Sequence, residues 1–245
     1  MSLILLFMAT FAGAFFAAVA GFGFALISTP LLCLIIPTKE AIVLLPVLTV
    51  VLRIITMHYT WGKFDKKTVG TVLLGYFVGT LPGAYVLKII SVAQLQVMLG
   101  IILMLVTTLM AKKYSVTIKN KFFGRATAGM LGSMLGAATS VNGPPIILYF
   151  LNEKVEKNVM RANLIWIFGI GSVANIIGNL VMGNMKEVSD WNHLKVMIPA
   201  VIIATYFGEK CFGKIDQQLF YRIALGAVFL GGTSMMLQGL FKILG

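Results

Sequence analysis

Residues 20–30 read AGFGFALISTP and interrupt an apolar run that continues to residue 36. A helix needs about 20 apolar residues to cross the hydrocarbon core of a bilayer, so two glycines at this point predict a helix that breaks inside the membrane. Residues 136–149 read GAATSVNGPPIILY and repeat the pattern later in the chain. The two stretches predict a bundle that contains two broken or re-entrant helix pairs.

The composition around these stretches is that of a membrane protein. Apolar residues make up 59% of the chain and charged residues only 11%, which leaves too few polar side chains to cover a water-soluble protein of this size. The apolar residues form runs long enough to span a bilayer, separated by short charged or Gly/Pro-rich breaks. We therefore predict an all-α polytopic membrane protein, with a single transmembrane domain over residues 1–245, in the cell membrane.

The apolar runs divide the chain into ten helical segments in two sets of five. The second segment of each set is short for a membrane span, and the break stands between it and the first segment. The predicted segments are about 3–20, 23–36, 39–58, 68–88 and 92–111 in the first set, and about 122–138, 143–152, 157–182, 194–211 and 218–242 in the second.

The two sets of segments resemble copies of one repeat. Residues 21–30 align with residues 140–149 at an offset of 119, and small residues at four-residue spacing recur in the fourth segment of each set. We interpret the small-residue rows as close helix packing. We predict repeat one at about 1–111, a connecting loop at about 112–121 and repeat two at about 122–245. The later aligned residues are Gly75, Gly79 and Gly83 with Ala200, Ala204 and Gly208, and Leu99, Gly100 and Thr107 with Leu225, Gly226 and Thr233.

The positive charge of the chain predicts its orientation. A formal net charge of +12 would suit nucleic acid, but the basic residues cluster in loops between apolar segments, which is the pattern of cytoplasmic loops in membrane proteins. With these loops in the cytoplasm, segments 39–58 and 157–182 run in opposite directions, both termini lie outside, and the repeats are inverted. The clustered residues are Lys63, Lys66, Lys67, Lys112, Lys113, Lys119, Lys121, Arg125, Lys154, Lys157, Arg161, Lys210, Lys214 and Arg222.

The two breaks carry the chemistry of an anion site. A helix that starts inside the membrane leaves its first N–H groups without intrahelical acceptors, and an anion satisfies both these groups and the positive end of the helix dipole. Glycine lets the backbone approach a ligand closely, and proline is tolerated at a helix start. The alternative is that both breaks are kinks satisfied by neighbouring helices and water. The predicted substrate-binding residues at the breaks are Gly21, Gly23, Phe24, Ser28, Thr139, Ser140, Asn142, Gly143 and Pro144.

Polar residues on the third segment of each repeat add to this site. Arg53 and Thr56 share one helix face in repeat one. At the offset of 119 they align with Ser172 and Asn175, which share a face in repeat two. An intramembrane cation that faces lipid is costly, so we predict that Arg53, Ser172 and Asn175 line the site, with the planar guanidinium binding an oxyanion. Alternatively, Arg53 snorkels to the cytoplasmic end of its segment near His58.

The remaining reactive side chains predict no cofactor and no metal site. His58 and His193 stand without an acidic or second imidazole neighbour, and Cys33 and Cys211 have no partner at metal-ligand or redox spacing. The acidic residues near the apolar segments lie at predicted segment ends, so no acid is expected to be buried as a proton carrier. These acids are Glu40, Glu153, Glu156, Glu187 and Glu209.

The two quoted stretches resemble the paired Gly-rich motifs of the TauE/SafE sulfite exporter family, and the resemblance extends over essentially the whole chain. It implies the fold of that family, which moves small sulfur oxyanions and organosulfonates across bacterial and archaeal membranes. This function agrees with the anion-receptive breaks. The chain departs from the family's usual motifs at Phe24, Ala25, Ser140 and Asn142, where glycines are common.

We predict a secondary transporter that moves a small anion, sulfite or a related sulfur oxyanion or organosulfonate, by alternating access around the two breaks. An anion channel for similar solutes is the alternative. An intramembrane enzyme would need a nucleophile and base, or metal ligands, that we do not find in the sequence. The expected partners are the small anion and the lipid bilayer, and no nucleic acid. A coupling ion, either a proton or sodium, and assembly into a homo-oligomer are both left open.

Overall fold

The computed structural model describes residues 2–111, 120–153, 155–211 and 217–244. These residues form ten α-helices and one 3₁₀ helix, with no strand among them, so the predicted all-α class is confirmed. Several of the predicted loop residues lie outside the described residues, as does the side chain of Arg222. These loop residues are Lys112, Lys113, Lys119, Lys154 and Lys214.

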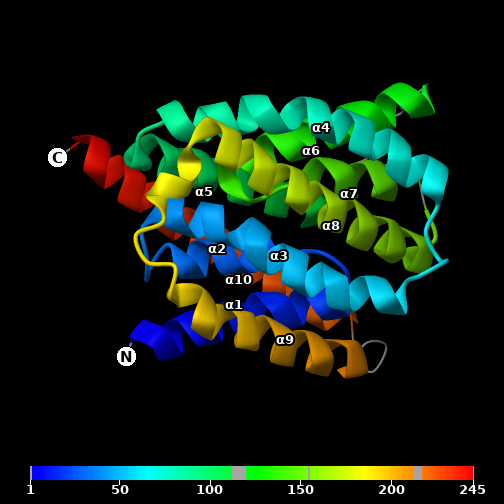
Figure 1. Ribbon diagram of the computed structural model, residues 1–245, viewed down its shortest axis with the longest axis horizontal. Coiled ribbons are helices and arrows are strands. Elements are labelled where there is room, and N and C mark those ends of the chain that lie inside the picture. The colour runs from blue at the N-terminus through cyan, green and yellow to red at the C-terminus, as the bar shows by residue number, and fades with distance from the viewer. Residues whose placement is uncertain (1, 112–119, 154, 212–216, 245) are drawn as a thin grey trace.

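The helices lie along the long axis of the molecule as one bundle (Figure 1). Within the described part of the chain, five helices are long and apolar enough to cross a membrane, namely α1, α3, α4, α5 and α8. In chain order the elements are α1 (Ser2–Ala20), α2 (Phe24–Leu32), α3 (Thr38–Tyr59), α4 (Lys66–Ile89), α5 (Val92–Ala111), α6 (Lys121–Thr139), α7 (Gly143–Asn152), α8 (Lys157–Met182), η1 (Asn184–Glu187), α9 (His193–Cys211) and α10 (Gln217–Leu244).

Local sequence explains where several helices begin. Asp65 precedes α4 and accepts hydrogen bonds from both the backbone N–H and the hydroxyl of Thr68. The hydroxyl hydrogen bond is the main reason that the pKa of Asp65 lies below its usual value. Asn120 caps α6 by accepting from two N–H groups of the first turn at 3.0 and 3.3 Å, and Glu156 caps α8 in the same way.

Contacts between the helices follow one symmetrical plan. The helices α4 and α6 pack together, and so do α1 and α9; α4 also contacts α8, and α9 contacts α3. When each of α1–α5 is exchanged with its counterpart in α6–α10, the α4–α6 contact becomes the α9–α1 contact. In the same way, the α4–α8 contact becomes the α9–α3 contact. The contacts α3 with α8 and α5 with α10 map onto themselves. This exchange is what two copies of one five-segment repeat would produce, as the alignment at residues 21–30 and 140–149 predicts.

Directions along the bundle agree with an inverted arrangement of the repeats. Figure 1 shows α3 and α8 running in opposite directions, as do α4 and α9, and it places both termini at the same end. The loop between α3 and α4 lies at the other end, beside the start of α8. The orientation of this bundle relative to the two sides of a membrane stays a prediction.

Small residues let α4 and α6 approach closely. A side chain added at Gly75 would come within 1.8 Å of the Ala126 carbonyl oxygen, and one at Gly79 within 2.1 Å of the Met130 carbonyl oxygen. The aligned Gly208 of α9 likewise lies directly against α1. The small-residue rows therefore act as close helix-packing surfaces, as predicted.

Candidate functional site

The first break is a tight reversal between α1 and α2. Gly21 and Gly23 have φ angles of 84° and 94°, a left-handed conformation that residues with a side chain adopt only with strain. Ile27 then donates the first hydrogen bond of α2, to the carbonyl of Gly23 at 3.2 Å. The N–H groups of Phe24, Ala25 and Leu26 precede this bond, so they have no intrahelical acceptor. These groups form the positive end of α2.

The second break lies between α6 and α7 and is built from different residues, a left-handed serine and two prolines. Ser140 takes the left-handed conformation here, with φ of 63°, and donates its hydroxyl to the carbonyl of Ile42 on α3 at 2.6 Å. This bond ties the tip to the body of the bundle. The next helix begins at Gly143, followed by Pro144 and Pro145, whose rings fit the first turn but carry no N–H group. The start of α7 therefore offers fewer backbone donors than the start of α2.

The starts of the two short helices meet at one small cavity of about 20 Å³. Four helices contribute to it: α2 and α7 by their first residues, α3 by Thr49 and Arg53, and α8 by Phe168. A space of this size has room for about one water molecule. The complete lining is Gly23, Phe24, Ala25, Leu26, Thr49, Arg53, Val141, Asn142, Gly143 and Phe168.

Arg53 supplies the positive charge of this cavity. Its side chain is buried, at 2% exposure, and its Nε and Nη1 atoms have no hydrogen-bond partner among the described residues. The guanidinium carbon lies 5.7 Å from the centre of the Phe168 ring, a cation–π contact. The burial disagrees with the snorkelling alternative, because the guanidinium turns into the bundle. No acidic residue is among those that line the cavity.

A tyrosine connects the second break to the helices behind it. The Tyr76 hydroxyl accepts hydrogen bonds from the side-chain amides of Asn142, at 2.9 Å, and Asn175, at 3.0 Å. Tyr76 on α4 is fully buried, and a side chain added at Gly171 of α8 would collide with its ring. The amide of Asn142 is therefore held by Tyr76 at the edge of the cavity.

The structure brings together five of the predicted site residues and places the others elsewhere. Gly23, Phe24, Arg53, Asn142 and Gly143 line the cavity. The remaining predicted residues are Gly21, Ser28, Thr139, Ser140, Pro144, Ser172 and Asn175, none of which lines it.

Local partners explain most of these differences. Gly21 packs on the stem of Arg161. Ser28 points at α1, where its hydroxyl donates to the carbonyl of Ala9 at 3.5 Å. Thr139 closes the end of α6 by bonding to the carbonyl of Leu135 at 2.7 Å. Pro144 faces an apolar hollow of about 760 Å³ between α5, α6 and α7, and Ser172 is buried on α8 away from the cavity.

Sequence reasoning missed five lining residues, namely Ala25, Leu26, Thr49, Val141 and Phe168, although a signal for Thr49 and Phe168 was present. Thr49 lies one helical turn before Arg53 and so shares its face of α3. The offset of 119 that aligns the breaks also aligns Thr49 with Phe168. The same register therefore identifies these two residues once Arg53 is placed in the cavity.

The expectation that no acid is buried is wrong for two residues. Glu40 is fully buried; one carboxylate oxygen lies 2.7 Å from Nδ1 of His193 and the other accepts from Ser189. Glu209 forms an ion pair with Arg161 at 2.5 Å, and its side chain is 8% exposed. The sequence did not indicate these pairs because the partners lie 153 and 48 residues apart. His193 likewise does have an acidic neighbour.

The cavity thus combines one end of α2, one end of α7 and a buried cation, an arrangement that suits a small anion. Comparison with known proteins agrees with this chemistry. The chain is 24% identical over 242 residues to a protein of Cupriavidus necator named a probable sulfite/organosulfonate exporter TauE, with 94% of this chain and 91% of that protein covered. No solved structure shows a significant match. The sequence model of the family described as sulfite exporter TauE/SafE matches residues 5–235, and the chain therefore belongs to that family.

Proposed function

We propose that this protein is a secondary transporter that moves a small sulfur oxyanion or organosulfonate across the cell membrane by alternating access. Membership of the sulfite exporter family and the name of the Cupriavidus necator relative support this substrate class. In this proposal each repeat supplies one broken helix pair, and the anion lies where the two pairs meet. Gly23, Phe24, Asn142 and Gly143 bind it from the breaks, and Arg53 binds it from α3.

The observation that carries the proposal is that two guanidinium nitrogens of Arg53 are buried without a hydrogen-bond partner among the described residues. A buried cation whose N–H groups have no acceptor is costly, because the hydrogen bonds that it made to water are not replaced. Arg53 has two nitrogens without a partner in the described part of the chain, and these lie at a cavity that also receives the first turn of α2. An anion in the cavity would accept hydrogen bonds from both, and charge-assisted bonds of this kind are the strong ones.

The size of the cavity supports alternating access rather than an open channel. About 20 Å³ accommodates roughly one water, whereas sulfite has four non-hydrogen atoms. The two breaks must therefore separate for the anion to enter. The Tyr76 hydroxyl and the Ser140 hydroxyl bind the second break to α4, α8 and α3, so movement of the first break alone would require fewer hydrogen bonds to rupture.

Flux into proteoliposomes tests the proposal. Purified protein should carry sulfite, thiosulfate or a short alkylsulfonate with saturation and with counterflow, in which external unlabelled anion drives the movement of labelled anion. Acetate and lactate serve as carboxylate controls and should move much more slowly. Equal rates for carboxylates and sulfur anions, or no flux of any sulfur anion, would reject the substrate assignment. Ohmic current without saturation would instead identify a channel.

A further inference from the structure

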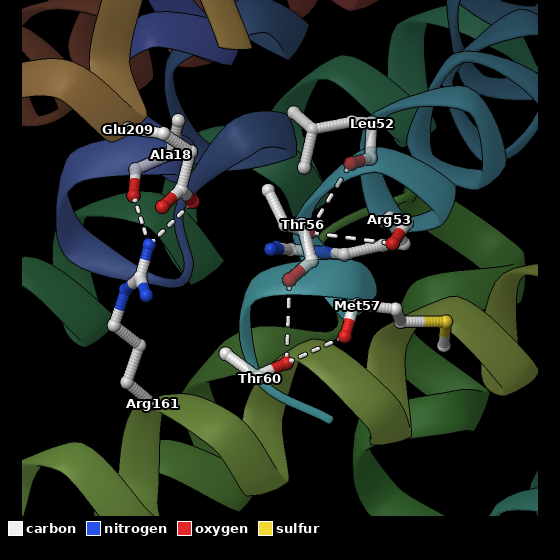
Figure 2. A network of polar contacts seen from close by, with 8 residues as sticks. All are labelled: Ala18, Leu52, Arg53, Thr56, Met57, Thr60, Arg161 and Glu209. Atoms are coloured by element: carbon white, nitrogen blue, oxygen red, sulfur yellow. Dashed lines mark hydrogen bonds and ion pairs between the residues drawn. The ribbon is translucent and has the colours of Figure 1, made fainter. Parts of the chain in front are cut away.

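A buried ion pair lies beside the first break, outside the cavity. The Nη2 atom of Arg161, on α8, donates two hydrogen bonds. One goes to the Glu209 carboxylate of α9 at 2.5 Å and the other to the Ala18 carbonyl of α1 at 2.7 Å. The two charged side chains are only 9% and 8% exposed. Figure 2 shows the Arg161 guanidinium reaching the last turn of α1 and Glu209 together. An ionisable group buried in a membrane protein is costly to maintain and commonly functional.

This ion pair lies in contact with the part of the molecule that must move. The stem of Arg161 packs on the backbone of Gly21, where an added side chain would approach its Cγ within 2.4 Å. The carbonyl that Arg161 also binds belongs to the last turn of α1, three residues before Gly21. A change in the Arg161–Glu209 pair therefore acts directly on the tip of the first break.

The charges near Glu209 come from two helices. Helix α9 packs against α1, whose residues 2–20 include no titratable side chain, and against α3, which contributes Arg53. Arg161 of α8 and Arg53 of α3 both interact electrostatically with the Glu209 carboxylate. On α9 itself, Lys210 turns to the ring of Tyr206, 4.1 Å from its centre. Within the described part of the chain, Arg53 and Arg161 thus share the Glu209 carboxylate, and these three groups together have a net charge of +1.

We propose that Glu209 is a proton-binding site linked to the anion site, so that the protein takes up a proton when it binds its anion. A proton on Glu209 removes the negative charge of the carboxylate that Arg53 and Arg161 share, so the net charge of these three groups rises from +1 to +2. An anion in the cavity is then attracted more strongly. By thermodynamic reciprocity, the bound anion favours protonation of Glu209 to the same degree. The inference rests on the proposed transport function and adds a coupling ion to it.

The first repeat has no equivalent of this pair, which lies entirely in the second repeat. At the offset of 119, Arg161 aligns with Ile42, and in the register that aligns Gly83 with Gly208, Glu209 aligns with Ala84. In the same alignment, the contact of Gly21 with Arg161 corresponds to the hydrogen bond from Ser140 to the carbonyl of Ile42. Neither group of that hydrogen bond is ionisable, so protonation does not affect it. The linkage through this pair therefore involves at most one proton for each bound anion.

Binding of methanesulfonate and of thiosulfate tests the inference, because neither anion changes its charge between about pH 5.5 and about pH 8. Wild-type protein in detergent should bind the tighter of the two about tenfold more weakly at the higher pH. Glu209→Gln, which keeps a hydrogen-bond acceptor for Arg161, should bind tightly at both pH values, with less than about twofold change. Glu187→Gln is the matched control, since Glu187 also pairs with a cation, Lys39 at 3.6 Å, but its side chain is 41% exposed. This variant should keep the wild-type pH dependence.

Proton uptake gives a second measurement that needs no variant. Addition of methanesulfonate to wild-type protein in weak buffer should raise the pH. A tenfold coupling corresponds to an uptake of at most about half a proton per bound anion, near the midpoint of the pH transition. The inference is overturned if wild-type binding is independent of pH, if no proton is taken up, or if Glu209→Gln keeps the wild-type dependence. If wild-type protein binds none of the sulfur anions at either pH, the proposed function fails as well, and the two failures are thereby distinguished.

Discussion

Replacement of Arg53 by Lys should weaken anion binding while the protein still folds. Lysine keeps the positive charge at the cavity but presents one nitrogen in place of the planar fork. Arg53 has two nitrogens, Nε and Nη1, without a partner among the described residues, so lysine loses at least one charge-assisted hydrogen bond to the anion. Such a bond contributes about 1.5–3 kcal/mol, which corresponds to roughly 10- to 150-fold weaker binding.

The assay is methanesulfonate binding to purified Arg53→Lys, together with the initial rate of sulfite flux in proteoliposomes. Arg125→Lys is the matched control, because Arg125 lies near the start of α6 and does not line the cavity. This variant should bind as the wild type does. A monodisperse elution profile shows that each variant is folded. Wild-type affinity in folded Arg53→Lys would refute the assignment of Arg53 to the anion.

Three further changes probe the break, its support and its orientation. Gly23→Ala should lower the thermal midpoint of unfolding, since a left-handed backbone costs a residue with a side chain about 1–2 kcal/mol. Gly143→Ala should leave this midpoint nearly unchanged and should reduce flux. Similar effects of the two substitutions on stability would contradict this reasoning. Tyr76→Phe removes the acceptor of two side-chain amides and should destabilise the protein by about 1–3 kcal/mol for each amide left unpaired, as a denaturation midpoint would report. Cysteine at Lys63 should be labelled by a membrane-impermeant reagent only from the cytoplasmic side and cysteine at Lys186 only from outside, and labelling of both from one side would disprove the predicted topology.

The fold was predictable because its determinants are local. Asp65, Asn120 and Glu156 each stand where a polar side chain can accept from the first turn of the helix that follows, and each of these helices begins within two residues of the predicted position. The end of α2 was predicted less well. The helix stops at Leu32, four residues early, because the next residues form tight turns that lead into Pro37.

The site was predictable where the backbone determines it and not where a distant side chain does. Gly23 and Gly143 could be assigned to the cavity because a break fixes the direction of its own N–H groups. Ser28 could not be assigned correctly, since its orientation depends on the carbonyl of Ala9 on a neighbouring helix. The partner of Glu209 lies 48 residues away on another helix, and no spacing rule in a single sequence connects them.

The exchange of partners between the two halves of the chain also constrains biosynthesis. While the chain is being made, α1 and α4 emerge before α9 and α6, the helices against which they pack in the finished protein. The surface of α4 at Gly75 and Gly79 fits the backbone of α6 closely. Until α6 is synthesised and inserted, this surface must therefore contact lipid or an insertion chaperone.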